Sequence, residues 1–239
     1  MPPTTERLFK MNNVSKTELE ASLLDISFIA NNSGLAEQIK GLMSLTQIYA
    51  SAIKEVTTKL EILNDQFKIQ YSHNPIRYIE SRVKSPRSIV EKCSRKGVNL
   101  TTEAVIENVL DIAGIRVICC YVDDIYRIAD MLLSQNDITL VRRKDYIKEP
   151  KENGYRSLHL VIRIPIFLAD RTELVPAEIQ IRTVAMDFWA SLEHQLRYKS
   201  SDGLPVSDGI ARELKECAED SAELDLRMQD IYRRLSSGE

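Results

Sequence analysis

The sequence predicts an α/β (α+β) protein, with a mixed sheet of about five strands flanked by long N- and C-terminal helices. Two patterns carry this prediction. Toward both ends of the 239-residue chain, apolar residues recur at steps of three or four, which is typical of one face of a helix. Between these segments, short β-branched and apolar runs alternate with turn residues and shorter helical patterns, which is typical of strands joined by helices.

The N-terminal part is predicted to be a leader followed by one long helix. Residues 1–34 are polar with weak apolar clusters, and we interpret them as a flexible leader with one short helix at residues 16–30. From Leu35 onward, apolar side chains follow at steps of three or four. The segment His73–Pro75 ends this pattern, so we expect a helical arm at residues 35–72.

The central region, residues 73–199, is predicted to contain the sheet. The expected strands span residues 76–83, 110–121, 138–146, 157–168 and 173–182. The expected helices span residues 85–97, 122–134 and 184–198. Pro86 suits the first turn of the first helix and Gly97 suits its end, while Asp123 is the expected N-cap of the second.

The last segment, residues 200–239, is predicted to hold a linker and a helix with a regular apolar seam. The seam comprises Ile210, Leu214, Cys217, Ser221, Leu224, Met228, Ile231 and Leu235. Such a seam needs an apolar partner, which is either a helix of another copy or the sheet of the same chain. Because the N-terminal helix has a similar seam, we favour oligomerisation through these helices.

The charge of the chain favours a small anionic ligand over a long polyanion. The net charge is −3, so no global basic field indicates a dedicated nucleic-acid-binding protein. Residues 82–96 nevertheless hold six Lys and Arg residues against Glu91 alone. A local basic patch in a mildly acidic protein is typical of a site for a small anion.

The cysteines and apolar runs predict a cytoplasmic protein with no membrane partner. The four cysteines show no metal-binding spacing, and we interpret them as reduced thiols. The N-terminus lacks the apolar core of a signal peptide. No apolar run approaches the roughly 20 residues that cross a bilayer.

Two neighbouring segments contain most of the residue types that nucleotide chemistry requires. The first, residues 151–159, surrounds one glycine with cations, an amide and the ring of Tyr155. The second, residues 178–183, has Glu178, Gln180 and Arg182 on one face of an apolar strand, because side chains alternate with period two. A base needs a stacking ring and phosphates need cations, so nucleotide chemistry is the leading hypothesis. The alternative for Tyr155 is ordinary packing.

Two carboxylates interrupt segments that should be buried. Asp111 begins an apolar run and Glu178 lies within one, and a buried carboxylate is costly unless it caps, pairs or binds a metal. With no Cys/His cluster nearby, the pair suits Mg²⁺. The alternatives are a turn role for Asp111 and pairing of Glu178 with Arg182 or Lys144.

Residues 82–88 read as a strand, a turn and a helix start, which is typical of a phosphate site. Arg82 and Lys84 share a strand face, and Ser88 and Lys92 lie one helical turn apart. The alternative is a solvated basic surface.

Together these segments resemble the synthetase domain of the RelA/SpoT family, and the length is similar to that of its single-domain small alarmone synthetases. The likeness covers about residues 75–199. The matching segments are residues 82–88, 111–116, 144–146, 151–159, 178–183 and 188–194. The resemblance implies a nucleotidyltransferase-like (p)ppGpp synthetase domain that transfers pyrophosphate from ATP to the ribose 3′-hydroxyl of GDP or GTP and releases AMP.

The resemblance also implies a role for individual residues. Those of the ATP site would be Arg82 and Arg116 around the adenine, with Lys84, Ser88 and Lys92 on the phosphates. Those of the GDP/GTP site would be Tyr155 on the guanine, with Lys144, Lys151, Asn153, His159 and Gln180 around it. Asp111 and Glu178 would be catalytic and bind Mg²⁺, and Glu178 is also a candidate base. Asp111 and Arg116 have opposite strand parity, so we expect an irregularity near Gly114.

The wider family contributes two further expectations. Long members carry a histidine/aspartate hydrolase domain, for which this sequence shows no His-Asp pair, so we expect synthesis only. Some small members form tetramers that bind the product as an activator. Here Glu80 and Asp187 lie near the corresponding segments, where negative charge repels a polyphosphate. We therefore predict a homotetramer with weak or absent product activation.

Two rival hypotheses make different predictions. Another nucleotidyl or phosphoryl transferase would release AMP with an acceptor other than a guanine nucleotide. A single-stranded RNA-binding module would use the basic patch and Tyr155, with affinity that falls steeply with salt and survives loss of Glu178. RNA as a regulator of an enzyme stays open.

Overall fold

The structure, a computed structural model, describes residues 33–71, 73–199 and 207–237; residues 1–32 of the predicted leader, with the helix expected at residues 16–30, lie outside them. The helices are α2 (Ser33–Tyr71), α3 (Pro86–Lys96), α4 (Thr102–Asn108), α5 (Val122–Leu133), α6 (Val184–Lys199) and α7 (Asp208–Ser237). The strands are β1 (Ile76–Val83), β2 (Ala113–Cys119), β3 (Thr139–Asp145), β4 (Leu158–Phe167) and β5 (Thr172–Thr183). The predicted order is confirmed, and α4 is an addition that we did not predict.

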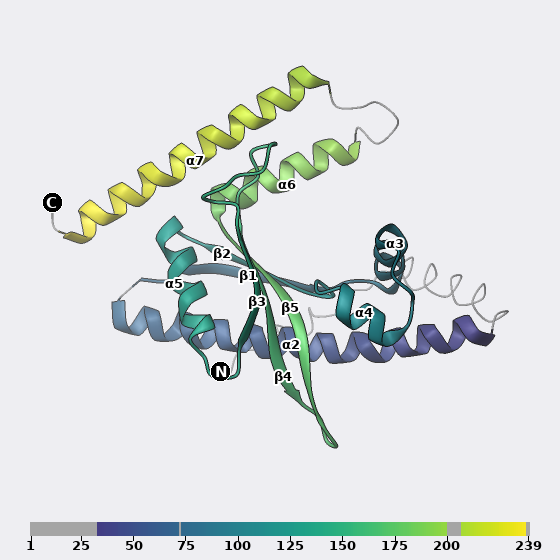
Figure 1. Ribbon diagram of the computed structural model, residues 1–239. Helices are drawn as coiled ribbons and strands as arrows, with labels where there is room; N and C mark the ends of the chain where they lie inside the picture. Colours follow the sequence, from purple (N-terminus) through teal and green to yellow (C-terminus); the bar gives the residue numbers. More distant parts are fainter. Residues whose placement is uncertain (1–32, 72, 200–206, 238–239) are drawn as a thin grey trace, which may run out of the picture.

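The strands form one mixed sheet in the order β1-β2-β5-β4-β3 (Figure 1). The central neighbours β2 and β5 are parallel, and the other neighbouring pairs are antiparallel. A parallel pair requires a long crossover, and here α5, β3 and β4 lie between the two strands in sequence. The predicted mixed, five-stranded sheet is therefore confirmed.

The central strands separate an apolar face of the sheet from a polar face. In β2, the side chains of Ala113, Ile115 and Val117 are buried, whereas Gly114 and Arg116 between them are only partly buried. Strand β5 repeats this alternation in register with β2. The apolar face forms the core, which leaves the opposite face for polar side chains.

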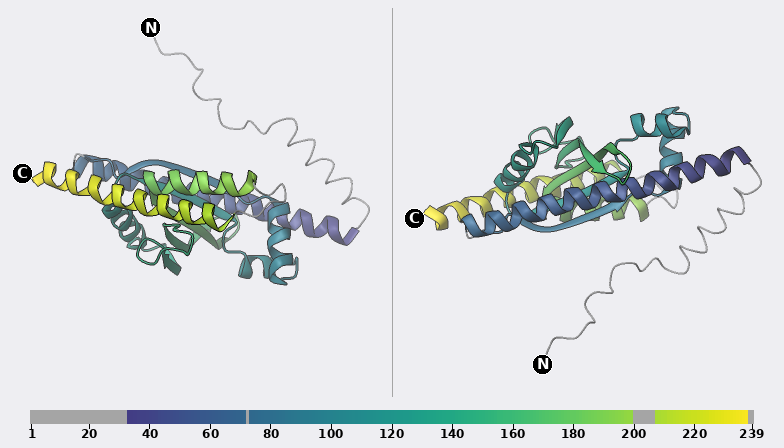
Figure 2. Two further views of the ribbon diagram at one scale, coloured as in Figure 1. Left: turned by 90° about the horizontal axis from the view of Figure 1, so that it is seen from above. Right: turned by 90° about the horizontal axis from the view of Figure 1, so that it is seen from below.

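Helix α2 covers the apolar face of the sheet (Figures 1 and 2). Its side chains Tyr49, Ala52, Val56 and Leu60 follow at steps of three and four and are almost fully buried. They belong to the same apolar cluster as Ile115 of β2. Burial of one large apolar side chain stabilises a fold by about 1.5–3 kcal/mol, so this stripe fixes α2 across the sheet.

The start of β2 differs from the prediction. We expected a strand from residue 110, but β2 begins at Ala113, and Asp111 lies in the turn before it. The pairing of β2 with β1 and β5 is regular on both sides of Gly114, so the expected irregularity there is wrong. The parity conflict between Asp111 and Arg116 disappears because Asp111 does not belong to the strand.

The start of α5 also differs from the prediction. Its N-cap residue is Tyr121, whose side chain makes no capping hydrogen bond, so the assignment of Asp123 as the cap is wrong. Instead, the backbone N–H of Asp123 donates to Oε1 of Gln229 at 2.8 Å, and its carboxylate pairs with Arg233 at 2.5 Å. Both partners come from α7, which therefore caps α5 from outside.

Helix α7 packs on α5 and α6 with an unexpected face (Figures 1 and 2). Its buried residues are Ala218, Asp225 and Gln229, which are small or polar. Much of the predicted apolar seam faces outward, with Leu224 53% and Leu235 74% exposed. The seam is thus left uncovered within the described part of the chain.

None of the described helices is long and apolar enough to span a bilayer.

Candidate active site

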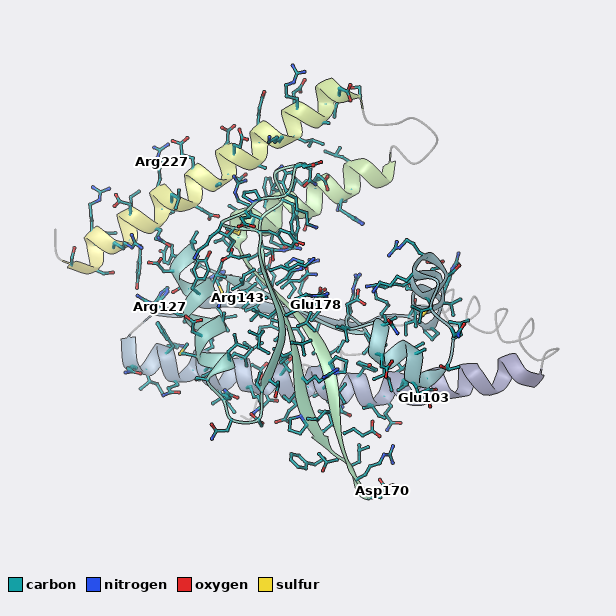
Figure 3. The ribbon with its side chains drawn as sticks, in the orientation of Figure 1. Glu103, Arg127, Arg143, Asp170, Glu178 and Arg227 are labelled. Atoms are coloured by element: carbon teal, nitrogen blue, oxygen red, sulfur yellow. The ribbon has the colours of Figure 1, made fainter. Side chains whose placement is uncertain are left out.

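Two rows of register partners cross the polar face of the sheet. One row consists of Lys144, His159, Gln180, Arg116 and Glu80, from β3 to β1. The other consists of Arg142, Val161, Glu178, Gly114 and Arg82. Residues two apart on a strand share a face, so the rows lie beside each other. The sheet thereby gathers side chains from five separate segments of sequence, with Glu178 near its middle (Figure 3).

A hollow of about 530 Å³ opens over β1, β2 and β5, and we call it the donor hollow. Its lining residues are Glu80, Ser81, Arg82, Lys84, Asp111, Gly114, Ile115, Arg116, Glu178 and Gln180. It brings together Arg82, Arg116 and Lys84, which we predicted for ATP, with the carboxylates Asp111 and Glu178. Its volume lies within the usual range of small-molecule sites.

Asp111 is held at the donor hollow by two lysines. Its Oδ2 accepts from Nζ of Lys84 at 3.0 Å and from Nζ of Lys92 at 2.5 Å. Burial alone would raise the pKa of Asp111, but the hydrogen bonds and charges of Lys92 and Lys84 outweigh it, so its pKa is lowered. The carboxylate is therefore ionised at neutral pH, and the lysines are fixed where we predicted phosphates.

Glu178 is a partly buried carboxylate whose pKa is also lowered. Burial would raise its pKa, but His159 and a hydrogen bond from Nε2 of Gln180 to Oε2 at 3.0 Å lower it. Nδ1 of His159 lies 3.8 Å from Oε1 of Glu178, which is too long for a hydrogen bond. His159 therefore acts on Glu178 as a nearby charge when its ring is protonated, and Glu178 is ionised at neutral pH.

A second hollow of about 230 Å³ lies over β3, β4 and β5, and we call it the acceptor hollow. Its lining residues are Arg142, Lys144, Tyr146, Lys151, His159, Val161 and Glu178. It contains Lys144, Lys151 and His159, which we predicted for the guanine nucleotide. Glu178 lines both hollows, so one carboxylate faces both sites.

Tyr155 belongs to an aromatic and cationic cluster at the acceptor hollow. Nζ of Lys151 lies 4.6 Å from the centroid of its ring and 4.8 Å from that of Tyr146. The hydroxyl of Tyr155 is 2.8 Å from Nε2 of His159. The structure thus brings Tyr155, Lys151 and His159 together, as the sequence predicts.

Arg182 is a buried part of the site to which we assigned no binding role. Its Nη2 donates to the hydroxyl of Tyr155 at 2.5 Å and to Oε1 of Gln180 at 2.9 Å. Its guanidinium also lies 5.0 Å from the centroid of the Tyr155 ring. The strand period placed Arg182 on the face of Glu178 and Gln180, but it gave no sign of the bond to Tyr155.

Asp187 of α6 links Arg182 to the donor side. Its Oδ1 accepts from Arg182 at 3.2 Å and lies 3.5 Å from Nη1 of Arg116, while Oδ2 accepts from the hydroxyl of Tyr78 at 3.1 Å. Its side chain is 11% exposed. Asp187 therefore faces the interior with its charge balanced, whereas Glu80 is exposed and pairs with Arg116 at 3.2 Å.

Several predicted residues do not line the hollow of their predicted nucleotide: Ser88, Lys92, Asn153 and Tyr155 line neither hollow, and Gln180 lines the donor hollow. Lys92 reaches the donor hollow through its bond to Asp111. Ser88 is in the first turn of α3 but does not line the hollow, and its hydroxyl accepts from that of Ser85 at 2.9 Å. Asn153 donates from Nδ2 to Oε1 of Glu193 at 3.1 Å and does not line the acceptor hollow. Their assignment to nucleotide sites stays a prediction.

The two carboxylates fit a magnesium ion. Oδ1 of Asp111 is buried and has no hydrogen-bond partner, although Oδ2 has two. Glu178 lines the same hollow, and the negative charge of Asp111 acts to raise the pKa of Glu178. No group of three or more His, Cys, Asp or Glu side chains among the described residues could enclose a metal. A site with few protein ligands is typical of Mg²⁺, which keeps waters and substrate phosphates as its other ligands.

Comparison with known proteins identifies the family of this chain. A family model described as a region found in RelA/SpoT proteins matches residues 81–203. This chain belongs to the RelA/SpoT family. A GTP pyrophosphokinase of Bacillus subtilis, YwaC, is 46% identical over 188 residues, covering 79% of this chain and 89% of the relative. The resemblance found in the sequence is therefore confirmed.

Solved structures of the RelA/SpoT family have the same fold. Small alarmone synthetase 2 from Bacillus subtilis has a TM-score of 0.73 and 44% identity, covering 81% of this chain and 98% of that one. Small alarmone synthetase 1 from the same organism, bound to its product pppGpp, has a TM-score of 0.70 and 39% identity. That likeness covers 78% of this chain and 93% of that one.

Proposed function

We propose that this chain is a GTP pyrophosphokinase that transfers the pyrophosphate of ATP to the ribose 3′-hydroxyl of GDP or GTP in stringent-response signalling. The products are ppGpp or pppGpp and AMP. The observation that carries this proposal is that Glu178 lines both hollows. A group-transfer enzyme needs its base where the two substrates meet, and the relative YwaC is named for this activity.

The proposed reaction is an in-line displacement at the β-phosphorus of ATP. The 3′-oxygen of the acceptor forms a bond to this phosphorus, the bond from it to the bridging oxygen of the α-phosphate breaks, and AMP leaves. Glu178 takes the proton of the 3′-hydroxyl. Its lowered pKa keeps it ionised and able to accept. Lys84 and Lys92 offset charge that develops on the phosphates, and Arg82 and Arg116 hold the adenine.

Mg²⁺ is the proposed cofactor, with Asp111 and Glu178 as its protein ligands. When bound, the ion supplies Lewis-acid stabilisation of the pyrophosphate. The acceptor is held by Tyr155, through stacking on the guanine, and by the cations Lys144 and Lys151. His159 orients the hydroxyl of Tyr155 at 2.8 Å.

The decisive test is a magnesium-dependent assay with labelled ATP and either GDP or GTP. Wild type should form ppGpp or pppGpp with equal amounts of AMP, and Glu178→Gln should lose at least about a hundredfold in rate. Glu173→Gln is the matched control, because Glu173 is on the same strand but lines neither hollow. Folded wild-type protein that makes neither product with either acceptor would refute the proposal.

We expect synthesis without hydrolysis of the alarmone. His73 and Asp124 do pair at 3.0 Å, but the imidazole packs against the rings of Tyr121 and Tyr232, at 5.7 and 4.9 Å between centroids, and these two rings stack on each other. This packing supports a structural role for the pair. Incubation of pppGpp with the enzyme should therefore release no pyrophosphate.

The proposed assembly is a homotetramer in the cytoplasm. Helix α6 exposes an apolar stripe of Val184, Phe188, Leu192 and Leu196, and the seam of α7 is exposed as well. Two such surfaces on one chain support more than one contact between copies. Light scattering should give the mass of four chains, and Leu224→Glu on the α7 seam should lower it.

We also expect pppGpp to activate the enzyme weakly or not at all. The carboxylates of Glu80 and Asp187 both pair with Arg116, and that of Glu80 stays exposed beside it, where its negative charge opposes binding of a polyphosphate. A severalfold rise in initial rate on titration with pppGpp would refute this. A single-stranded RNA regulator, if there is one, should bind with a steep salt dependence.

A further inference from the structure

The acceptor loop, residues 151–157 between β3 and β4, carries side chains of the acceptor site but lies outside the sheet. Its own backbone bonds are local: the N–H of Gly154 donates to the carbonyl of Lys151 at 2.8 Å, and that of Lys151 to the carbonyl of Tyr155 at 3.2 Å. Lys151 and Tyr155 flank this turn. Any shift of the turn therefore moves the ammonium and the ring together.

The acceptor loop packs directly on helix α7. Gly154 is buried, with a φ of +91°, which side chains rarely adopt. A Cβ at Gly154 would lie 2.6 Å from the Cβ of Ala218, closer than real Cβ atoms approach. Both conditions require glycine here. The backbone of the loop thus packs against the methyl group of Ala218, with no room for a side chain at residue 154.

Arg156 joins the acceptor loop to the same point on α7. Its Nη1 donates to the carbonyl of Gly154 at 3.0 Å and to the carbonyl of Ala218 at 3.2 Å. One nitrogen therefore bridges the backbone of the loop and the backbone of the helix. Arg156 has no place in the predicted nucleotide sites, so this bridge accounts for its position.

Helix α6 contacts both the acceptor loop and α7. The indole Nε1 of Trp189 donates to the carbonyl of Leu214 at 2.7 Å, which ties α6 to α7. Asn153 of the loop donates to Glu193 of α6 at 3.1 Å. Trp189, Arg156 and Ala218 line one small cavity where these three elements meet.

We propose that Arg156, with the contact between Gly154 and Ala218, is a latch that makes α7 a positioning element of the acceptor site. The proposal rests on the function proposed above and adds a residue and a helix to it. The latch should favour binding of the guanine nucleotide and leave ATP unaffected. The reason is that the lining of the donor hollow comes from β1, β2, β5 and the turn at Asp111.

The first test compares Arg156→Ala with Arg227→Ala, a control on an exposed arginine of α7 (Figure 3). We expect Arg156→Ala to raise the KM for GDP or GTP about three- to tenfold, as for loss of one or two hydrogen bonds. The KM for ATP should stay within about twofold of wild type. Arg156→Lys should be intermediate, because a single nitrogen makes both bonds. Equal changes in both KM values, or no change, would overturn the proposal.

The second test is a rescue that depends on contact. Gly154→Ala should raise the acceptor KM through the clash with Ala218 and the strained φ. Adding Ala218→Gly removes the clashing Cβ, so the acceptor KM of the double variant should return part of the way to the wild-type value. The rest of the increase should remain, because the strained φ at residue 154 is unchanged. The effects of the two substitutions would be additive if the loop did not rest on α7, and this outcome would refute the latch.

The third test does not depend on catalysis. Hydrogen exchange in the acceptor loop should be faster in nucleotide-free Arg156→Ala than in wild type or Arg227→Ala. Emission from Trp189, the only tryptophan of the chain, should shift to longer wavelength in the same variant. Faster exchange in a protein without synthetase activity would refute the proposed function but support the latch. Unchanged exchange with an active wild type would refute the latch alone.

Discussion

The two hollows that share Glu178 are built in different ways. The donor hollow is lined by residues of three neighbouring strands and the turn before one of them. Its charges are fixed by direct ion pairs, such as those of Asp111 with Lys84 and Lys92. The acceptor hollow depends on a loop, in which Lys151 lies over the ring of Tyr155, Arg182 of β5 donates to the Tyr155 hydroxyl, and Asn153 donates to Glu193 of α6.

This difference follows from what each nucleotide requires. Phosphates need several cations at fixed positions, and strands in register provide such positions with little conformational freedom. A base needs a ring with room to stack, and a loop can present one without burying it completely. We therefore expect substitutions at the donor hollow to lower activity by removing charge. Substitutions at the acceptor hollow should lower it by misplacing the groups that bind the nucleotide.

The largest expected effect is on the donor side. Asp111→Asn removes a proposed metal ligand and the charge that fixes Lys84 and Lys92, so kcat/KM for ATP should fall about 10²–10³-fold. The KM of the acceptor should change little. Asp130→Asn, on an exposed carboxylate of α5, is the control for charge alone. A variant with normal ATP kinetics and a lost acceptor site would reverse the proposed division between the hollows.

Arg182→Met should have the next largest effect, and on the acceptor side. It removes the donor to Tyr155 and Gln180, so kcat/KM for the acceptor should fall about 10–100-fold, as for charged hydrogen bonds. Arg182→Lys should not restore it, because one ammonium cannot reach all these partners. Melting temperatures are needed beside the kinetics, since Arg182 is buried and its loss leaves Asp187 with fewer partners.

A smaller effect is expected at Tyr155, where the ring and the hydroxyl can be tested separately. Tyr155→Phe keeps the ring but loses the contacts with His159 and Arg182, so the acceptor KM should rise about three- to tenfold. Tyr155→Ala also loses stacking, which is worth about 1–3 kcal/mol per base. Identical defects in the two variants would mean that the ring does not stack on the base.

The sequence predicted the strands and helices that carry the site better than the contacts between them, for a physical reason. Strand period and glycine, proline and charge patterns are local, so β1, α3 and the face shared by Glu178 and Gln180 could be read directly. The strand that follows Asp111 begins at residue 113, three residues later than predicted, because β propensity does not mark where a ladder begins. The turn role of Asp111 was the alternative we had left open.

What the sequence could not show depends on contacts between distant segments. The cap of α5 comes from Gln229, more than one hundred residues away. The face of α7 that packs on the rest of the chain carries Ala218, Asp225 and Gln229, which their hydropathy does not mark as buried, so the apolar seam did not reveal it. The role of Arg182 likewise depends on Tyr155 and Asp187, which no local pattern places beside it.

The smallest expected effect concerns how α7 is attached beside the acceptor site. The buried carboxylate of Asp225 accepts from the hydroxyl of Thr183 at 2.5 Å, and Thr183 directly follows Arg182 at the end of β5. Burial raises the pKa of Asp225 to about 6, although the bond from Thr183 opposes this. Because the folded state holds this proton more tightly than the unfolded state, the stabilisation is present below about pH 4 and is lost as pH rises to about 6.

Asp225→Asn should remove this pH dependence while keeping an acceptor for Thr183. At pH 7–8 the variant should melt roughly 2–6 °C above wild type, because it avoids a buried charge, and near pH 4 the two should melt together. Thermal melts across this range measure the difference. A variant less stable than wild type at pH 8 would show that the ionised carboxylate, and not its proton, holds α7 against β5. The KM for ATP should be unchanged in either case, since α7 contacts the acceptor loop and contributes no residue to the lining of the donor hollow.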